Sequence, residues 1–565
     1  MELRTNKAEM SGTRTAILLG FAVVLTVAAR GQNAVHPRFA PDPRLSVYQY
    51  AVTEAGCTAY LWIPERCRFV RGIIIALSNL TERDWLEDSL IRKTAADEGL
   101  GIAWVSLGKN ATITADMDKA SGRALEQLLD DLADASGYTE IATAPLLPMG
   151  HSAHGHFAWT VAKWNPGRTI ATIPFKTIPW PDSLGFKDVP VCYIVGQTTE
   201  WPQYRVPDPA TQPGDRDFYW PVVTRGAVAL RSADEHNLVG VVTDAGGGHF
   251  DWNDRLARFV ALYIRKACAY RLPPAPAGND GAGASAAAAR RASAPALLRA
   301  IAPGQGWLTD TGGMSPDRYP PAPYKKYQGD PRKAFWFFDE ETARAAAAFE
   351  GDRKQRARQM PTFVQDGDTI DPAKTGYAPL KFEPGEDGLT FTVRGAFLDK
   401  MPRELLGSGT TLGHADGPIR FEVITGPAEQ TGPNTFRVRF NRDGIGGDIW
   451  LLAWQPGDEQ YRWAVQPGKI HLPDGPNESG RITFPKIKGQ KLEATSDNGR
   501  PVYYYVDFGP AYIKGDSLIL TKIPPRSRYP VAVTVTAYQW GRTQTPLYQT
   551  AEPVTQTIYI EKTHQ

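Results

Sequence analysis

The chain has 565 residues, which is more than one compact domain usually holds, so we expect two or three domains. Its composition, 42% apolar and 22% charged, is that of ordinary globular protein. A formal net charge of +2 leaves no electrostatic footprint for nucleic acid or for an anionic membrane surface, and we disfavour both as partners.

The first thirty residues have the pattern of a secretory signal peptide. Three basic residues, Arg4, Lys7 and Arg14, precede an apolar run over 16–29. That run is too short and too close to the terminus for a comfortable membrane span, so we predict a signal peptide at 1–30, with a retained anchor as the alternative. The mature protein is then expected to be periplasmic or extracellular, with no further membrane association.

Strand-like and helix-like patterns alternate from about residue 45 to 271. This alternation predicts a mostly parallel sheet covered on both faces by helices. The clearest helix is 124–135, whose leucines fall on one face. Short apolar runs of the buried-strand type lie at 73–77, 102–107, 145–149, 171–175, 191–195 and 238–243.

Ser152 lies between an apolar run that ends in Gly150 and a helical stretch over 157–164, in the sequence Pro-Leu-Leu-Pro-Met-Gly-His-Ser-Ala-His-Gly. A strand that runs straight into a helix forces a sharp turn, and the side chain at its apex stands clear of both elements. The next backbone N–H, that of Ala153, is directed at the same space. Gly150 keeps the turn uncrowded.

This motif resembles the nucleophile elbow of the α/β-hydrolase superfamily. The family's usual small residue two places after the serine is His154 here, and glycine follows at Gly155. The count and order of the strands also suit this family. The resemblance implies a doubly wound α/β-hydrolase catalytic domain of the serine esterase type over residues 45–271, with no cofactor.

A serine hydroxyl attacks a carbonyl only if a neighbouring imidazole takes its proton. Location removes most of the nine histidines: three belong to the elbow, and four lie before the domain or in the later β-rich part. His249 follows strand 238–243 through a glycine-rich loop and precedes a helical stretch, where the family has its base. We predict His249 as the base, and His236, before that strand, is the alternative.

The third member of a serine triad is a carboxylate between the serine and the histidine in chain order. Glu200 follows strand 191–195 and the turn Gly-Gln-Thr-Thr, where the family usually has its acid. We predict Glu200 in this role, and three residues farther along the same loop remain alternatives: Asp208, Asp215 and Asp217.

An oxyanion needs two donors, and the N–H of Ala153 supplies one of them. The resemblance implies that the second comes from the loop after strand 73–77, at Ser78 or Asn79.

Three histidines within six residues, His151, His154 and His156, raise the question of a metal site. Their spacing differs from His-Glu-x-x-His and no acidic residue is adjacent, so we predict no metal.

Four cysteines all lie before residue 270. Export would permit a local bridge between Cys57 and Cys67, whereas Cys192 and Cys268 have patterns for which simple burial is at least as good an explanation as a bond.

The remainder of the chain divides by composition. Residues 272–297 are rich in Pro, Gly, Ala and Ser and predict a flexible linker. The sequence of region 298–375 permits no fold assignment, although residues 334–349 have a helical pattern. From there short β-type runs alternate with Gly/Pro turns, which is typical of β-sandwiches, and we divide them into modules at 376–472 and 480–562.

A repeat supports two tandem modules. The sequence Val-Ile-Thr-Gly-Pro-Ala at 423–428 recurs as Val-Asp-Phe-Gly-Pro-Ala at 506–511, and Ala-Trp-Gln-Pro-Gly at 453–457 recurs as Ala-Tyr-Gln-Trp-Gly at 537–541. The second module, with Ala-Thr-Ser-Asp-Asn-Gly-Arg-Pro-Val at 494–502 and Val-Thr-Val-Thr-Ala at 533–537, resembles the bacterial immunoglobulin-like repeats of exported proteins. Such repeats imply spacing or adhesion and carry no catalytic residues.

These patterns favour a secreted serine hydrolase that cleaves carboxylic esters through an acyl-enzyme. The architecture favours an ester on a polymer, such as an acyl group on polysaccharide. The alternative is a catalytically inactive, hydrolase-like surface protein that binds its target through the immunoglobulin-like modules. The sequence leaves the oligomeric state open.

Overall fold

The computed structural model describes residues 42–177, 187–196, 220–274, 298–311, 319–371, 376–402, 408–440, 442, 447–473, 480–545 and 547–562. The predicted signal peptide and most of the predicted linker lie outside these ranges. No helix in the described part of the chain is long and apolar enough to cross a membrane.

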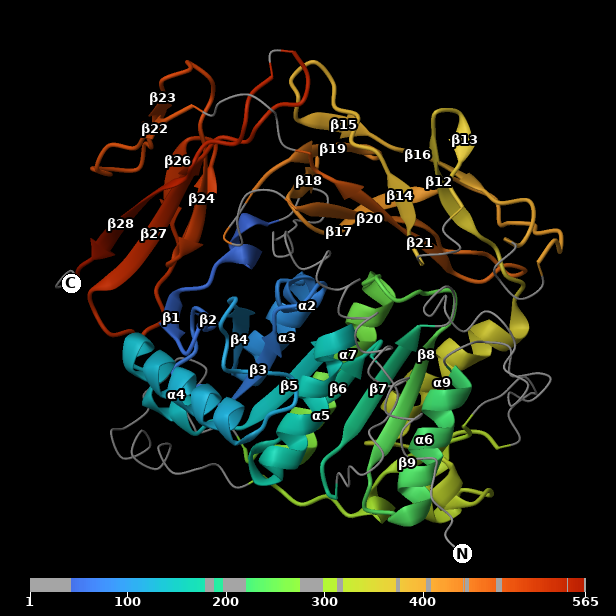
Figure 1. Ribbon diagram of the computed structural model, residues 1–565. Helices are drawn as coiled ribbons and strands as arrows, with labels where there is room; N and C mark the ends of the chain where they lie inside the picture. Colours follow the sequence, from blue (N-terminus) through green and yellow to red (C-terminus); the bar gives the residue numbers. More distant parts are fainter. Residues whose placement is uncertain are drawn as a thin grey trace, which may run out of the picture.

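An eight-stranded sheet, in the order β1-β2-β4-β3-β5-β6-β7-β8, forms the centre of the N-terminal half (Figure 1). β1 pairs antiparallel with β2, β2 pairs antiparallel with β4, and each later pairing is parallel. The predicted mixed α/β class with a mostly parallel sheet is confirmed. The strands are β1 (Tyr50–Glu54), β2 (Cys57–Trp62), β3 (Gly72–Leu77), β4 (Leu100–Leu107), β5 (Leu146–His151), β6 (Ile173–Phe175), β7 (Val191–Gly196) and β8 (Val239–Asp244).

The central strands are apolar throughout because helices cover both faces of the sheet. In β3, Ile73 and Ile75 pack in one buried cluster and Ile74 and Ala76 in another, since successive side chains point to opposite faces. The helix α4 (Lys119–Ser136) supplies four leucines of the first cluster: Leu125, Leu128, Leu129 and Leu132. The second cluster contains residues of α3 (Ser89–Glu98), α6 (Trp220–Ala233) and α7 (Asp254–Arg271).

The described residues of 298–355, a region to which the sequence assigned no fold, pack onto this domain. They form the small sheet β10-β9-β11 and the helix α9 (Glu340–Gln355). The strands are β9 (Trp307–Thr309), β10 (Ala322–Pro323) and β11 (Phe335–Phe337). Trp336, Phe337 and Phe349 join the cluster that contains β8 and α7, so this segment completes one face of the α/β domain.

The predicted helix over 334–349 is wrong in its first part. Residues 335–337 form β11, which pairs with β9. The helix begins only after Asp339, whose carboxylate accepts the N–H of Thr342. The aromatic run therefore behaves as a buried strand, and the capping aspartate marks the true helix start.

The first β module contains two sheets with a shared core. The sheet β14-β21-β20-β17 and the sheet β15-β19-β18 both contribute to one apolar cluster. A third sheet, β13-β12-β16, adds Phe363 to it, so described strands of this module begin before the predicted residue 376. The strands are β12 (Pro361–Gln365), β13 (Asp368–Thr369), β14 (Ala378–Leu380), β15 (Thr390–Thr392), β16 (Arg394–Phe397), β17 (Arg420–Thr425), β18 (Ala428–Gln430), β19 (Thr435–Val438), β20 (Asp448–Gln455) and β21 (Ala464–His471).

The second β module has its own apolar cluster. Its sheets are β24-β27-β28, β25-β26 and β22-β23. The strands are β22 (Ile482–Thr483), β23 (Thr495–Ser496), β24 (Tyr503–Phe508), β25 (Ala511–Lys514), β26 (Ser517–Leu520), β27 (Val531–Tyr538) and β28 (Val554–Ile560).

The sequence repeat occupies equivalent places in the two modules. The first block of each copy lies at the end of a strand. In the first copy this strand is β17, which pairs with β20, and in the second it is β24, which pairs with β27; both pairings contain a register shift. A glycine with positive φ follows, Gly426 at 105° and Gly509 at 121°, and the next strand begins at the alanine. Ala453 and Ala537 of the second block lie in β20 and β27 respectively.

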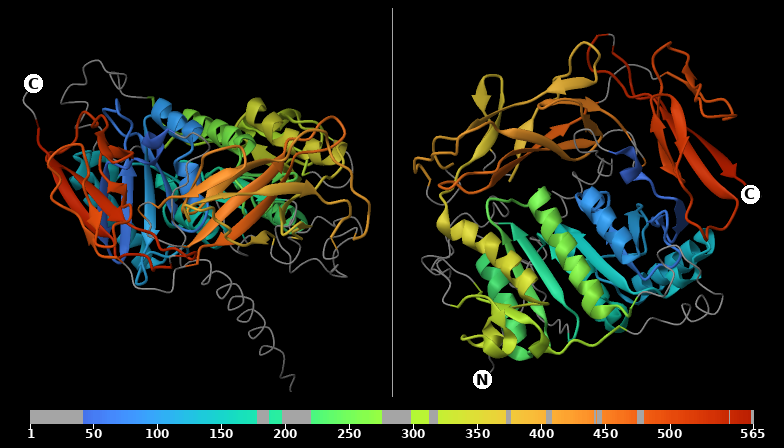
Figure 2. Two further views of the ribbon diagram at one scale, coloured as in Figure 1. Left: turned by 90° about the horizontal axis from the view of Figure 1, so that it is seen from above. Right: turned by 180° about the vertical axis from the view of Figure 1, so that it is seen from behind.

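The two β modules curve over one end of the α/β sheet, as Figure 1 and Figure 2 show. The first module lies over the end of the sheet at which α2 (Glu82–Leu86) begins. The second module lies beside β1 and α4, where Gly509 donates its N–H to the carbonyl of Tyr48 and Arg528 donates its N–H to that of Ser136.

Candidate active site

Ser152 is the first residue after β5 and has a backbone φ of 52°. A 3-10 turn, Ser152–His154, leads from it into the helix α5 (Gly155–Trp164). A non-glycine residue with positive φ is uncommon, and such strain at a strand-to-helix turn is how a nucleophilic serine is displayed. A Cβ on Gly150 would lie 2.1 Å from the carbonyl oxygen of His154, so the turn closes this tightly only with glycine there.

His249 lies directly against Ser152. Its Nε2 atom is 2.8 Å from Ser152 Oγ, although the two residues are 97 positions apart in the chain. Both side chains are buried, with 2% of Ser152 and 5% of His249 exposed. The alternative histidine, His236, lies elsewhere and places its Nδ1 2.7 Å from an oxygen of Asp188. The structure therefore brings together the serine and the histidine that the sequence singled out.

The surroundings of His249 keep its imidazole neutral. Burial lowers its pKa well below the usual range, and His151 and the cation of Lys176 lower it further. A neutral ring can accept a proton at Nε2, which is the state that a general base requires at neutral pH.

All of the hydrogen bonds of His151 serve to fix the elbow. Its ring Nε2 is 2.8 Å from the carbonyl oxygen of His249, and since a carbonyl only accepts, the ring must donate. Its backbone N–H donates to Glu82 Oε1 over 2.9 Å, and its backbone carbonyl accepts from Asn79 Nδ2 over 2.9 Å. Burial lowers the pKa of His151 to about 3, which keeps this ring neutral.

Glu82 ties the loop after β3 to the elbow. Its second carboxyl oxygen accepts the N–H of Leu80 over 2.9 Å, while the first accepts that of His151. Burial raises the pKa of Glu82 to about 8, and these backbone donors act in the opposite direction. Sequence reasoning missed Glu82 because Thr-Glu-Arg-Asp resembles the polar start of any surface helix.

A buried ion cluster fixes the loop that carries His249. Lys176, directly after β6, has no exposed side-chain surface and places Nζ 2.8 Å from Asp251 Oδ1 and 3.3 Å from Asp244 Oδ2. Asp244 ends β8, and Asp251 also accepts the N–H of Gly248 over 2.7 Å. The cluster therefore holds both ends of the His249 loop. Burial raises the pKa of Asp244, and the Lys176 cation opposes that shift.

The predicted oxyanion residues have different places in the structure. Ala153 follows Ser152 in the turn, as expected. The N–H of Ser78 donates to the carbonyl of Val105 over 2.7 Å, and the side-chain amide of Asn79 is used by His151. Both donor groups therefore already have acceptors within the protein. The two residues help to hold the loop after β3 against the turn at Ser152.

The other two elbow histidines have separate surroundings. The carbonyl of Ser78 raises the pKa of His154, against the larger lowering effect of burial. His156 places Nδ1 3.9 Å from Asp116 Oδ1. The described residues contain no group of three or more His, Cys, Asp or Glu side chains arranged to hold a metal.

Glu200 and its three alternatives, Asp208, Asp215 and Asp217, lie outside the described residues. The assignment of the triad acid therefore stays a prediction.

The first β module packs against the His249 loop. The ring of Phe250, the next residue after His249, lies 4.7 Å from that of Trp450 on β20. The N–H of Val465 on β21 donates to the carbonyl of Gly246 over 3.2 Å. Leu80, from the loop after β3, joins Trp450 and Val465 in one apolar cluster. The module thus contacts both loops that approach Ser152.

All four cysteines are free and buried, so Cys57 and Cys67 form no bridge here. Burial raises the pKa of each thiol, which makes these residues unreactive.

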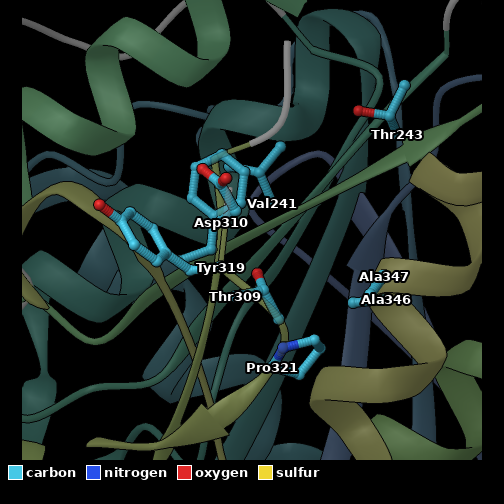
Figure 3. A pocket seen from close by; sticks show the side chains of 9 residues that line it. Val241, Thr243, Thr309, Asp310, Tyr319, Pro321, Ala346 and Ala347 are labelled. Carbon is cyan, nitrogen blue, oxygen red and sulfur yellow. The ribbon is translucent and has the colours of Figure 1, made fainter. Parts of the chain in front are cut away.

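A small cavity lies beside the sheet, between β8, β9 and α9 (Figure 3). Thr309, Asp310 and Tyr319 contribute its polar groups. Its volume is about 20 Å³, and because one water occupies roughly 10–15 Å³ on this measure, it is too small for a substrate.

Neither a protein-family model nor a curated protein matches this sequence. Among solved structures, it is similar to poly(aspartic acid) hydrolase-1 from Sphingomonas sp. KT-1, at 12% identity over 38% of this chain and 97% of that one, with a TM-score of 0.28. It is also similar to LpqC, a poly(3-hydroxybutyrate) depolymerase from Bordetella parapertussis, at 13% identity over 44% of this chain and 95% of that one, with a TM-score of 0.26.

A third similar structure is Est1E from Butyrivibrio proteoclasticus, at 14% identity over 39% of this chain and 96% of that one, with a TM-score of 0.24. Similarities this distant carry no argument about activity. Any inference about the class of enzyme rests instead on the strand order of the sheet and on the contact between Ser152 and His249.

Proposed function

We propose that the protein is a serine hydrolase of the α/β-hydrolase type that cleaves carboxylic esters through an acyl-enzyme. The observation that carries the proposal is the 2.8 Å contact between Ser152 Oγ and His249 Nε2, at a serine whose backbone is in the left-handed region. Ser152 is the nucleophile, His249 is the base, and Glu200 is the acid that orients the imidazole. No cofactor is required.

In the first step His249 Nε2 takes the hydroxyl proton while Ser152 Oγ bonds to the carbonyl carbon of the ester. The carbonyl oxygen becomes an oxyanion, to which the N–H of Ala153 donates. As the carbonyl re-forms, the bond to the alcohol breaks, and the leaving oxygen takes the proton from His249. Water then repeats the sequence on the acyl-enzyme and releases the acid and free Ser152.

The described residues hold this machinery in place before substrate arrives. His151 fixes the backbone of His249, and the cluster of Lys176 with two aspartates fixes its loop. A base held within hydrogen-bond distance loses little entropy on reaching the transition state, and such positioning contributes a large part of enzymatic rate.

We further propose that the C-terminal region comprises two immunoglobulin-like modules and that the protein is exported. The equivalent bulge and glycine in the two repeat copies support the tandem modules, and the basic and apolar N-terminal pattern supports export. These features favour an ester carried on an extracellular polymer, such as an acyl group on polysaccharide.

The test is hydrolysis of p-nitrophenyl acetate and longer-chain esters by the purified protein and by Ser152→Ala, His249→Ala and Glu200→Ala. Loss of activity by about 10³-fold or more for serine and histidine, and a smaller loss for Glu200→Ala, is expected. Activity that survives Ser152→Ala would refute the proposal. Activity on no ester or amide would favour the inactive binding protein instead.

A further inference from the structure

A large cleft separates the α/β domain from the first β module. Its volume is about 900 Å³, within the range of roughly 300–1,000 Å³ that ligand sites occupy. One wall contains residues from the start of α7 and from α9, and the other contains residues of β17, β20 and the segment before β21. The cleft is open to solvent and lies outside the set of residues that contact Ser152.

Two stacked tryptophans line the wall that the β module contributes. Trp454 on β20 and Trp463 just before β21 have ring centroids 4.8 Å apart and an interplanar angle of 28°. Both are partly exposed. The guanidinium of Arg420 lies 5.0 Å from the centroid of the Trp454 ring, so Trp454 is stacked between Arg420 and Trp463, and the outer face of the pair belongs to Trp463. Flat aromatic surface beside solvent suits a ligand that presents flat faces of C–H groups, because such a ligand gains dispersion and burial without losing its own hydroxyl contacts to water. Pyranose rings have such faces.

Arginine dominates the opposite wall. Arg255, Arg258, Arg344 and Arg356 line the cleft, against Asp254 and Glu422, so its charged lining residues leave an excess of two positive charges (four minus two). Arg344 also pairs with Glu340 over 2.7 Å, and Arg255 lies 3.8 Å from Asp244. Arg258 is exposed and forms no ion pair with any described residue. Guanidinium groups bind carboxylates through two parallel hydrogen bonds.

The cleft begins close to the catalytic loop. Asn253, one of its lining residues, is four residues after His249, so their Cα atoms are at most about 14 Å apart even along a fully extended chain. A polymer that occupies the end of the cleft at Asn253 therefore lies within a few sugar units of the loop that carries His249.

We propose that this cleft binds an acidic polysaccharide, with a pyranose ring stacked on Trp463 and uronate carboxylates attracted to the positively charged wall, where Arg258 is exposed to pair with one of them. The proposal rests on the proposed function, because it makes the cleft the place where the polymer is held while Ser152 attacks an ester on it. A polymer without rings would leave the outer face of Trp463 unused, and a neutral polysaccharide would offer no carboxylate to the exposed guanidinium of Arg258.

Calorimetric titration of the full-length Ser152→Ala protein with oligogalacturonate of about eight units tests the cleft without turnover. Neutral cello-oligosaccharide of the nearest available length is the comparison ligand. We expect saturable binding of the acidic oligomer only, weakened by added salt. Trp463→Ala and Arg258→Gln, each added to Ser152→Ala, are expected to weaken it by about tenfold or more.

Two control variants carry matched changes away from the cleft. Arg123→Gln changes an exposed arginine of α4, and Tyr559→Ala changes an exposed aromatic residue of β28. Both are expected to bind like the parent. Equal binding of the neutral oligomer, no binding at all, or binding that Arg258→Gln leaves unchanged would overturn the proposal. The ester assay with native protein tests the hydrolase separately. Binding of the acidic oligomer without ester hydrolysis would refute the hydrolase proposal and support the cleft proposal. Ester hydrolysis without binding would refute only the cleft proposal.

Discussion

The imidazole of His151 donates a hydrogen bond to the backbone carbonyl of His249 over 2.8 Å. His151 directly precedes Ser152, and His249 is the residue whose ring contacts Ser152 Oγ. The turn that carries Ser152 therefore also holds the backbone of His249, the proposed base, and a rotation of this turn would move both members of the pair together. This contact gives the histidine-rich elbow a role that requires no metal.

Removal of that donor should slow the chemical step more than substrate binding. In His151→Phe the carbonyl of His249 loses its partner, while the ring volume is largely kept. Because small misplacements of a base are costly, we expect kcat on p-nitrophenyl acetate to fall about 10- to 100-fold with little change in KM. His151→Gln retains a terminal N–H and should lose less. Equal rates for the two variants would contradict this role.

Removal of the Lys176 cation from its cluster should strongly lower the free energy of unfolding. Lys176→Met leaves Asp251 and Asp244 buried without their nearest cation, although Arg255 stays 3.8 Å from Asp244. Removal of one partner from a buried ion pair costs about 3–5 kcal/mol. Urea unfolding of the variant measures this loss directly. The exposed pair of Lys93 and Asp97 provides the control, since Lys93→Met should cost under about 1 kcal/mol.

A second variant separates charge from packing in this cluster. Adding Asp244→Asn to Lys176→Met removes one of the stranded charges and should restore part of the lost stability. A double variant less stable than Lys176→Met would show that packing of the lysine chain, and not its charge, dominates.

The parts of the site that the sequence could reveal are those with local patterns. Ser152 lies at a strand-to-helix junction that its neighbours encode, and His249 follows the last apolar run in an order that a parallel sheet imposes. Glu82 and Lys176 have no such pattern. Each is a charged residue near a strand end, and only the fold shows that each is buried among backbone donors or aspartates. The same limit applies to the described part of 298–355, whose aromatic residues join the core of the α/β domain as well as packing against one another, as Trp336 does against Phe338.

Glu82 should make stability depend on pH in a specific direction. Its folded pKa of about 8 lies above the ordinary value of 4.5, so between these values the folded state holds a proton that the unfolded state has lost. The stabilisation is complete below pH 4.5 and is lost as the pH rises through 8. Glu82→Gln has no such proton.

We therefore expect the unfolding free energy of the native protein to fall, relative to Glu82→Gln, by about 1.4 kcal/mol per pH unit between pH 5 and 7. Urea unfolding of both proteins at pH 5, 6 and 7 measures the difference. Parallel curves for the two proteins would show that Glu82 does not take up a proton on folding.

The two repeat glycines should be equally intolerant of substitution. A Cβ on Gly426 would lie 2.2 Å from the carbonyl oxygen of Asp448, and one on Gly509 would lie 2.6 Å from the Cα of Val533. Gly426→Ala and Gly509→Ala should each lower stability by about 2 kcal/mol or more, because steric overlap adds to the strain of positive φ. Gly499 has a φ of 68° and open space around it, so Gly499→Ala reports the strain alone. If thermal unfolding shows that Gly499→Ala loses as much stability as Gly426→Ala and Gly509→Ala, steric overlap at the two repeat glycines adds nothing to the strain of positive φ, and the prediction is wrong.

The contact between Phe250 and Trp450 joins the first β module to the loop of the proposed base, His249. Trp450→Ala leaves a space beside the residue that follows His249, and we expect the loop to relax into it. Trp540 is the matched control, since it is also buried but packs against Phe382 and Phe440, within the β region.

Both substitutions, Trp450→Ala and Trp540→Ala, should lower the free energy of unfolding by about 3–5 kcal/mol. Only Trp450→Ala should also lower kcat/KM on p-nitrophenyl acetate, by about tenfold or more, when measured well below the unfolding temperature. If both variants keep the native kcat/KM, the module covers the loop without positioning it, and the precision of the base comes entirely from His151 and the Lys176 cluster.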